Sequence, residues 1–227
     1  MGHGRYIPSE PVLEGAVLVG GPLKEIVFSG MSRRYVVRSG GDLHLTLLAL
    51  PGNDAGFDIS VDLVGEGAVA RLDGLYLCGS DESVSIRTAV HHRVGGALSR
   101  QLFKGIAGGA SKAVFDGTII VAPDAEKTEA YQENHNILLS ESARVETRPQ
   151  LEIYADDVKC SHGATVGRLD PEAQFYMRTR GIPEGEARIL QMLSFLSPVL
   201  ETLPENFGEG HSRGEIISSI ESALRSM

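Results

Sequence analysis

A cysteine and a histidine stand two residues apart late in the chain, at Cys160 and His162. Because alternate residues of a β-strand point to the same face, a strand here would hold the thiol and the imidazole side by side. Thiolate and imidazole are both ligands for iron and zinc. A structural metal site normally needs four ligands, so a metal at this pair would be bound transiently or shared with another chain. The residues alone favour the alternative, a buried cysteine beside a histidine that hydrogen-bonds a turn.

The remaining residues of these two types have simpler interpretations. His91 and His92 are adjacent, so on a strand they face opposite sides and cannot join one site. His135 precedes an apolar stretch and is interpreted as a polar turn residue in preference to a ligand. Cys78 follows an apolar cluster and is predicted to be a small buried residue.

We expect no motif typical of an enzyme, and in particular no Gly-x-Ser-x-Gly elbow of a serine hydrolase. The sequence has no GxxxxGK[ST] loop, so we expect no ATP binding of the P-loop kind and assign any ATPase activity to a partner. It has neither Cys-x-x-Cys nor His-Glu-x-x-His, which argues against a standing zinc site. The glycine-rich stretch 105–109 is predicted to be a turn. We therefore expect no enzyme activity, no catalytic residue and no stably bound cofactor.

The charge balance argues against two classes of partner. The 227 residues hold 21 Lys plus Arg against 30 Asp plus Glu, a formal net charge of −9. Nucleic acids and anionic membrane surfaces both attract basic proteins, so we expect no nucleic acid and no membrane as partners. Residues 1–8 form no apolar signal segment, and no apolar run reaches the length of a bilayer span. We expect a cytoplasmic protein with reduced thiols.

The elements that must position these residues begin with a β region. Residues 13–166 hold short apolar clusters, and several alternate apolar with polar residues, as at 59–63. This period of two predicts strands with one buried face, separated by turns rich in glycine and proline. Strands without intervening helices predict an all-β core, which the pattern alone leaves open among sandwich, barrel and solenoid. No strict repeat of fixed period is visible in the sequence.

The pattern becomes helical after residue 167. Helix starts are predicted from a cap or a proline at Asp170 with Pro171, at Pro183, and at the capping box of Ser212 with Glu215. Pro198 is expected to kink or break the second helix. We therefore expect a β core over residues 1–167 and a helical segment over residues 168–227.

Several ordered motifs stand out in the sequence: SRQLFKG at 99–105, DAEKTEAYQ at 124–132, NHNILLS at 134–140, LEIYADDVKCSHGATVG at 151–167 and RGIP at 180–183. Together they resemble the SufB/SufD family of iron–sulfur cluster assembly proteins, and its SufD branch in particular. Residues before 43 match only in general character. Most family members carry a large N-terminal helical region that has no counterpart in this sequence, so we expect a short member or an isolated core.

The resemblance implies both a fold and a role. It implies a right-handed parallel β-helix, that is a β-solenoid, with a C-terminal helical segment. It implies a non-enzymatic scaffold subunit that pairs with a SufB-like subunit and docks a SufC-like ABC ATPase. His162 matches the family position that faces SufB across the subunit interface, and Cys160 matches the neighbouring SufD cysteine. The pair would then be transient interface ligands for an iron–sulfur cluster.

Two alternatives from other functional classes stay open at this point. Parallel β-helices also host carbohydrate-active enzymes, although the sequence has no Trp to stack on a sugar ring. A homo-oligomeric structural β-solenoid would use an exposed strand edge to pair with itself. In isolation the chain is expected to use the same edge to form a homodimer.

Overall fold

The computed structural model describes residues 14–28, 30–52, 54–207 and 211–227. The start of the predicted β region at residue 13 lies outside the described residues. Strands occupy the chain up to Gly167, and the first helix begins at Pro171. The predicted change from strands to helices is therefore confirmed, with one short hairpin between the second and third helices.

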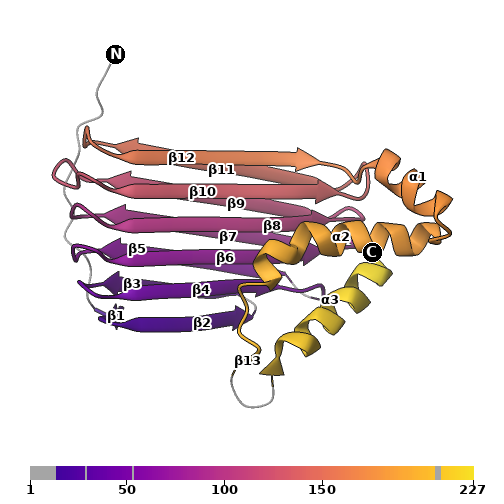
Figure 1. Cartoon of the computed structure of the whole chain (residues 1–227), viewed down its shortest axis with the longest axis horizontal. Helices are drawn as coiled ribbons and strands as arrows, with labels where there is room; N and C mark the ends of the chain where they lie inside the picture. Colours follow the sequence, from indigo (N-terminus) through magenta and orange to yellow (C-terminus); the bar gives the residue numbers. More distant parts are fainter. Residues whose placement is uncertain (1–13, 29, 53, 208–210) are drawn as a thin grey trace.

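The strands form two stacked six-stranded sheets (Figure 1). The odd-numbered sheet contains, in spatial order, β1 (Val17–Val19), β3 (Met31–Val37), β5 (Ala55–Leu63), β7 (Ser83–His92), β9 (Lys112–Val121) and β11 (Arg144–Ile153). The even-numbered sheet contains β2 (Pro22–Phe28), β4 (Asp42–Ala49), β6 (Val69–Cys78), β8 (Leu98–Ala107), β10 (Glu129–Leu138) and β12 (Lys159–Gly167). The chain alternates between the sheets, so each turn adds one strand to each of them.

Every pairing within the two six-stranded sheets is parallel. The prediction of a parallel β-solenoid is thus confirmed, and sandwich and barrel are excluded for the described residues. In the even-numbered sheet Val69 pairs with Leu98, Leu98 with Glu129, and Glu129 with Lys159, so one turn takes about 30 residues. The repeat is one of backbone register, and it is hidden in the sequence because the side chains differ from turn to turn.

An apolar core fills the space between the sheets. Buried residues alternate with more exposed ones along β7 and β9, as expected for strands with one inward face. Gly74 lies beneath the ring of Phe103, where a Cβ would come within 2.2 Å of a ring carbon. Gly105 lies beneath the ring of Tyr76 in the same way. The turn predicted over residues 105–109 is therefore wrong at its start, because Gly105 lies within β8 and makes room for an aromatic ring, and the chain turns only at Gly109.

Three helices and a hairpin follow the solenoid: α1 (Pro171–Thr179), α2 (Glu184–Leu200), β13 (Asn206–Phe207), β14 (His211–Ser212) and α3 (Arg213–Ser226). Figure 1 shows α2 and α3 lying against the even-numbered sheet. The apolar faces of these helices, with Leu196 on α2 and Ile220 on α3, form a second core with outward side chains of that sheet, which include Leu75 and Ile106. This cover explains why the second half of β6 is buried on both faces.

The helix boundaries follow the predicted capping signals. The Asp170 side chain accepts a hydrogen bond from the Glu172 N–H, and Ser212 and Glu215 form the full capping box of α3. The predicted break at Pro198 is wrong, because α2 continues through it to Leu200. The Ser194 carbonyl, which a residue at 198 with an N–H would normally bond, accepts instead from the Ser197 hydroxyl at 2.9 Å.

Candidate interaction site at the open end of the solenoid

The last turn of the solenoid, formed by β11 and β12, has an uncovered edge in each sheet. β11 pairs with β9 and β12 pairs with β10, and among the described residues neither strand has a second neighbour. β12 is also solvent-exposed over most of its length, with Cys160 and Gly163 half-buried. An unpaired strand edge presents a row of N–H and C=O groups to another chain, so this end of the solenoid is a template for pairing.

The register shows which groups of β12 face the open edge. The Lys159 N–H donates to the Thr128 carbonyl at 2.9 Å, toward β10. In a parallel pair successive residues direct their backbone groups to opposite sides. The residues of β12 whose N–H and C=O face the open edge are therefore Cys160, His162, Ala164 and Val166.

The open edge of β11 is less suited to pairing than that of β12. The Arg144 N–H donates to the Ser111 carbonyl, toward β9, so the odd-numbered positions of β11 face the open side. Pro149 occupies one of these positions and has no N–H to offer. β12 contains no proline. The edge of β12 is thus the stronger candidate for strand pairing.

Cys160 and His162 lie where the sequence predicted, on one face of β12. Cys160 is in register with the buried Ala130 of β10, and His162 is in register with the buried Gln132. Both therefore point toward the inside of the solenoid, at its open end. The His162 side chain is exposed, and it forms no hydrogen bond with another described residue.

The thiol of Cys160 is kept protonated by its surroundings. Burial raises the pKa of Cys160, and a backbone hydrogen bond with Ala130 opposes this only in part. The neighbouring cation does not activate the thiol, because Lys159 bonds Glu129 at 3.1 Å on the outer face of the sheet. That pair raises the pKa of Lys159 and lowers the pKa of Glu129. Cys160 therefore needs a metal or another group before it becomes a good ligand.

The described residues contain no group of three or more His, Cys, Asp or Glu side chains placed to hold a metal ion. Cys160 and His162 supply one sulfur and one nitrogen from the end of a strand, which leaves a metal short of ligands. A soft thiolate and an imidazole still suit iron as a partial ligand set. The donor set therefore fits a metal centre that a second chain completes.

The structure assigns other places to the remaining predicted residues. His91 and His92 face opposite sides of β7, as predicted, with the His92 Nε2 2.8 Å from the Ser99 hydroxyl inside the solenoid. Cys78 is buried in the core, as predicted. The turn predicted at His135 is wrong, because this residue lies within β10 and its Nδ1 is 2.9 Å from the Thr165 hydroxyl on β12.

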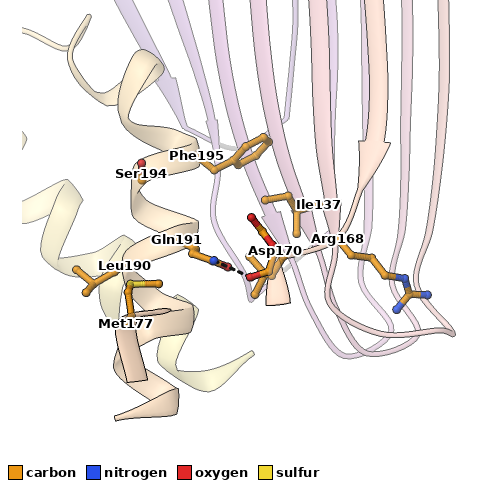
Figure 2. A pocket seen from close by; sticks show the side chains of 9 residues that line it. Ile137, Arg168, Asp170, Met177, Leu190, Gln191, Ser194 and Phe195 are labelled. Carbon is orange, nitrogen blue, oxygen red and sulfur yellow. Dashed lines mark hydrogen bonds between the residues drawn. The ribbon is translucent and has the colours of Figure 1, made fainter. Parts of the chain in front are cut away.

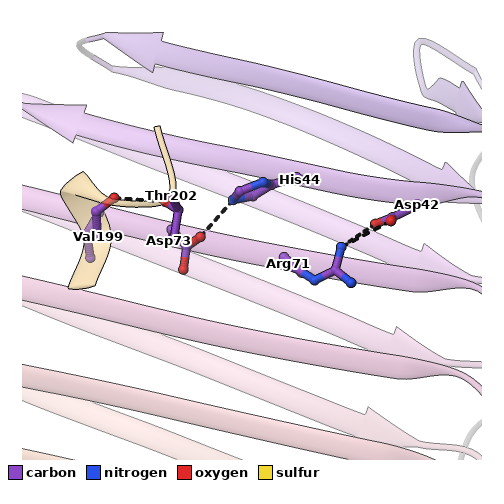
Figure 3. A network of polar contacts seen from close by, with 6 residues as sticks. All are labelled: Asp42, His44, Arg71, Asp73, Val199 and Thr202. Carbon is purple, nitrogen blue, oxygen red and sulfur yellow. Dashed lines mark hydrogen bonds and ion pairs between the residues drawn. The ribbon is translucent and has the colours of Figure 1, made fainter. Parts of the chain in front are cut away.

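Two pairs of polar side chains on the outer face of the even-numbered sheet were missed by the sequence analysis (Figure 3). The His44 Nε2 lies 2.7 Å from an Asp73 carboxylate oxygen, and Arg71 donates to Asp42 at 2.8 Å. Each pair joins β4 to β6 across a separation of 29 residues, which is one solenoid turn. Such a separation has no local sequence signal. The two pairs link β4 to β6, which belong to neighbouring turns of the solenoid, on the outer face of the sheet.

The expectation that the sequence contains no Gly-x-Ser-x-Gly pattern is wrong, because residues 210–214 have this spacing. In serine hydrolases this spacing places the serine at a strand-to-helix turn beside a catalytic histidine. Here the Ser212 hydroxyl accepts from the Glu215 N–H and donates to the Glu215 carboxylate, as the cap of α3. Ser212 is therefore a capping residue and not a nucleophile.

A second exposed surface lies where α1 and α2 meet the end of β10 (Figure 2). A hollow of about 440 Å³ opens there, with Leu190, Met177 and Phe195 among its lining residues. Gln191 reaches across it and donates to the Asp170 carbonyl at 2.9 Å. α1 contributes no buried residue, and its Phe175 and Tyr176 side chains are 67% and 59% exposed. Exposed aromatic side chains beside an apolar hollow are typical of a protein–protein contact.

Among the described residues no helix is both long enough and apolar enough to cross a membrane. Comparison with known families matches residues 24–195 to the model described as "SUF system FeS cluster assembly, SufBD core domain". The match therefore includes the solenoid turns from β2 onward, α1 and most of α2.

Comparison with individual proteins finds relatives from several bacteria. The iron–sulfur cluster assembly protein SufD of Escherichia coli is 45% identical over 144 residues, which cover 63% of this chain and 34% of that protein. An iron–sulfur cluster assembly SufBD family protein of Synechocystis is 41% identical over 116 residues, which cover 51% of this chain and 25% of that protein. The iron–sulfur cluster assembly protein SufD of Bacillus subtilis is 33% identical over 146 residues, which cover 64% of this chain and 33% of that protein. The matched region thus spans about a third or less of each relative.

Proposed function

The chain belongs to the SufB/SufD family of iron–sulfur cluster assembly proteins, and we propose that it is a non-enzymatic scaffold subunit of an assembly complex. The observation that carries the proposal is the open end of the solenoid, where a free strand edge, a thiol and an imidazole occur together on β12. A scaffold needs a surface for a partner and donor atoms at that surface, and β12 supplies both.

The partner of β12 in this proposal is a SufB-like subunit. A homologous chain with the same parallel solenoid would present a similar edge, and two such edges can continue each sheet across a junction. The edge-facing backbone groups of Cys160, His162, Ala164 and Val166 would bond the partner strand. In the absence of that subunit, a second copy of this chain is the next best partner, as a two-fold homodimer.

Cys160 and His162 then lie at the junction, where the second chain can supply the missing ligands. The iron–sulfur cluster is cargo in this scheme and leaves the complex after assembly. His162 is the stronger candidate, since it is exposed and its ring nitrogens bond no other described side chain. Cys160 is half-buried with a raised pKa, so it contributes only once a metal displaces its proton.

The surface formed by α1 and α2 is the proposed docking site for a SufC-like ABC ATPase. Leu190 is an exposed lining residue of the hollow of Figure 2, and Phe175 and Tyr176 are exposed on α1, the helix that contributes Met177 to the same hollow. In this proposal the ATPase covers all three side chains. The P-loop that the present sequence lacks would be provided by that partner. Cys78 and Cys160 are both free thiols, in agreement with a cytoplasmic assembly.

Co-purification with a tagged SufB-like subunit tests the junction. Ala164→Pro removes one N–H from the open edge of β12 and leaves the bonds between β12 and β10 in place. We expect it to reduce retention by the partner at least tenfold. Ala164→Val keeps the N–H and should be retained like the wild type. Equal retention of both variants would contradict pairing along this edge.

Co-purification with a SufC-like ATPase tests the helical surface separately. Phe175→Glu places a charge in the proposed contact without disturbing a buried residue, so retention of the ATPase should fall while the junction persists. Ser218→Glu introduces the same charge at an exposed position of α3, away from the hollow, and is the matched control. If Phe175→Glu and Ser218→Glu lost ATPase binding equally, the loss would not be specific to the surface of α1 and α2, which would contradict docking there.

A further inference from the structure

One inward column of the even-numbered sheet changes character along the solenoid. From β4 onward its residues are in register from strand to strand, namely Leu45, Leu72, Gln101, Gln132 and His162, and the same register reaches Glu25 of β2 at the opposite end. The first two are fully buried leucines of the apolar core. The next two are amides with 2% and 0% exposure, and the last is the exposed His162 of the junction. The interior of the solenoid thus becomes polar toward its open end.

The amides of this column lack enough hydrogen-bond partners. The Gln101 oxygen is 2.8 Å from the Thr88 hydroxyl, but its amide nitrogen has no partner among the described residues. Neither the nitrogen nor the oxygen of the Gln132 amide has a hydrogen-bond partner among the described residues. Further unpartnered atoms of the same last turns are Thr128 Oγ1, Asn134 Nδ2 and Thr147 Oγ1. Buried polar groups without any partner are rare, because each costs free energy.

Side-chain volume is small on one side of this column. The neighbouring inward column on that side runs from Leu43 through small residues, which include Ser99 and Ala130. On the other side stand Phe103 and Asn134. Across the interior from Gln132 stands Gly117, where a Cβ would come within 2.4 Å of the Gln132 amide nitrogen, so a glycine makes room for this amide.

The chemistry of the unpartnered atoms selects the ligand. Amide nitrogens donate, amide oxygens accept and hydroxyls do both, so the ligand must be small, neutral and able to donate and accept. Water meets these conditions, and buried waters typically bond about three such groups. We propose that Gln101 and Gln132 hold a column of ordered water inside the last turns of the solenoid, and that this column reaches the open end beside His162.

The consequence for the junction rests on the proposed function. A partner chain that covers β12 would remove bulk water from His162. The water column would then connect His162 to Gln132 and Gln101 from within the chain, and it would be a route for water and protons into a closed interface. The column itself is a property of the isolated chain, so it can be tested without any partner.

A crystal structure of the whole chain at high resolution tests the column directly. We expect ordered waters within hydrogen-bond distance of both amide atoms of Gln132 and of the Gln101 nitrogen. If Gln101 and Gln132 instead bond each other directly, or bond the ring of His162, with no water between them, the proposal is overturned. This outcome is independent of whether the chain binds a SufB-like subunit.

A pair of substitutions provides a second measurement in solution. Gln132→Met keeps the length of the side chain and removes its two polar atoms, while the waters that bond the Gln101 nitrogen can stay in place, so no buried polar group loses its partner. We expect its melting temperature to stay within about 4 °C of the wild type. Gln150→Met, at an exposed position of β11, is the control for the substitution itself. A much larger fall for Gln132→Met alone would contradict a water column and indicate a direct amide network.

Discussion

The inner turns of the solenoid and its last turn share one backbone register but differ in nearly everything else. In β4 and β6 the inward residues are fully buried apolar side chains, and α2 and α3 cover part of the outer face. In β12 most side chains are exposed, and among the described residues the strand has β10 as its single neighbour. The inner turns are built for stability, whereas the last turn leaves its hydrogen bonds and donor atoms for another chain.

The largest expected difference concerns apolar packing. Leu72→Ala in β6 should lower the free energy of unfolding by about 2–5 kcal/mol, since Leu72 is fully buried and its removal leaves a cavity. Leu151→Ala makes the same change on β11, where the side chain is half-buried, and should cost about 1 kcal/mol. Urea unfolding of both variants measures the contrast. Similar costs would mean that the last turn is packed as tightly as the inner ones.

The next largest effect depends on pH. Burial lowers the pKa of His92 to about 4, below the value of about 6.5 expected in the unfolded chain. As pH falls below 6.5, the unfolded chain takes up a proton at this site and the folded chain does not until about pH 4. Stability should therefore be lost in that window, by about 2 kcal/mol between pH 7 and pH 5 from this residue.

The variant His92→Gln isolates this contribution. It can still bond Ser99 but cannot titrate, so its stability should fall less between pH 7 and pH 5 than that of the wild type. Parallel stability curves for the wild type and His92→Gln would refute the assignment to His92.

A smaller effect is expected in the helical layer that covers the inner turns. Ser212→Ala removes the side-chain cap of α3 and should cost about 1 kcal/mol. Ser218→Ala lies at an exposed position within the same helix and should be neutral or slightly stabilising. Thermal unfolding of the two variants compares them. Equal stabilities would show that the capping box does not contribute to holding α3 in place.

The smallest effect on stability is expected at the site itself. His162→Ala should change the melting temperature by no more than about 2 °C, since the ring is exposed. In a complex with SufB-like and SufC-like partners, the same variant should carry less iron and sulfide than the wild type. Cys160→Ala should reduce the iron and sulfide content less than His162→Ala does. Full cluster content in His162→Ala would remove His162 from the site, and a large loss of stability would make it a core residue.

Local patterns in the sequence were reliable wherever the physics is local. The period of two predicted the strands, the caps at Asp170 and Ser212 predicted helix starts, and the spacing of Cys160 and His162 placed them on one face. The turns wrongly predicted at residues 105 and 135 depended on contacts one solenoid turn apart, whereas the break at Pro198 failed because the helix continues through a proline. Gly105 was interpreted as a turn because the ring of Tyr76, which requires it, comes 29 residues earlier.

The choice of a solenoid came from the resemblance to a family and not from the pattern of strands. Parallel pairing across about 30 residues has no local signature, because an inward position can be Leu72 in one turn and Gln101 in the next. The amides at 101 and 132 could not be recognised as neighbours for the same reason. Their relation became visible only when the register of β8 and β10 was known.

Hydrogen exchange at single-residue resolution tests the central claim most directly, with the chain alone and then mixed with a SufB-like subunit. The account predicts new protection at the amides of Cys160, His162, Ala164 and Val166, whose N–H groups face the open edge of β12. The amides of Lys159 and Ser161, which face β10, should change less because they are already bonded within the chain. Complex formation without new protection at these four positions would contradict pairing along β12.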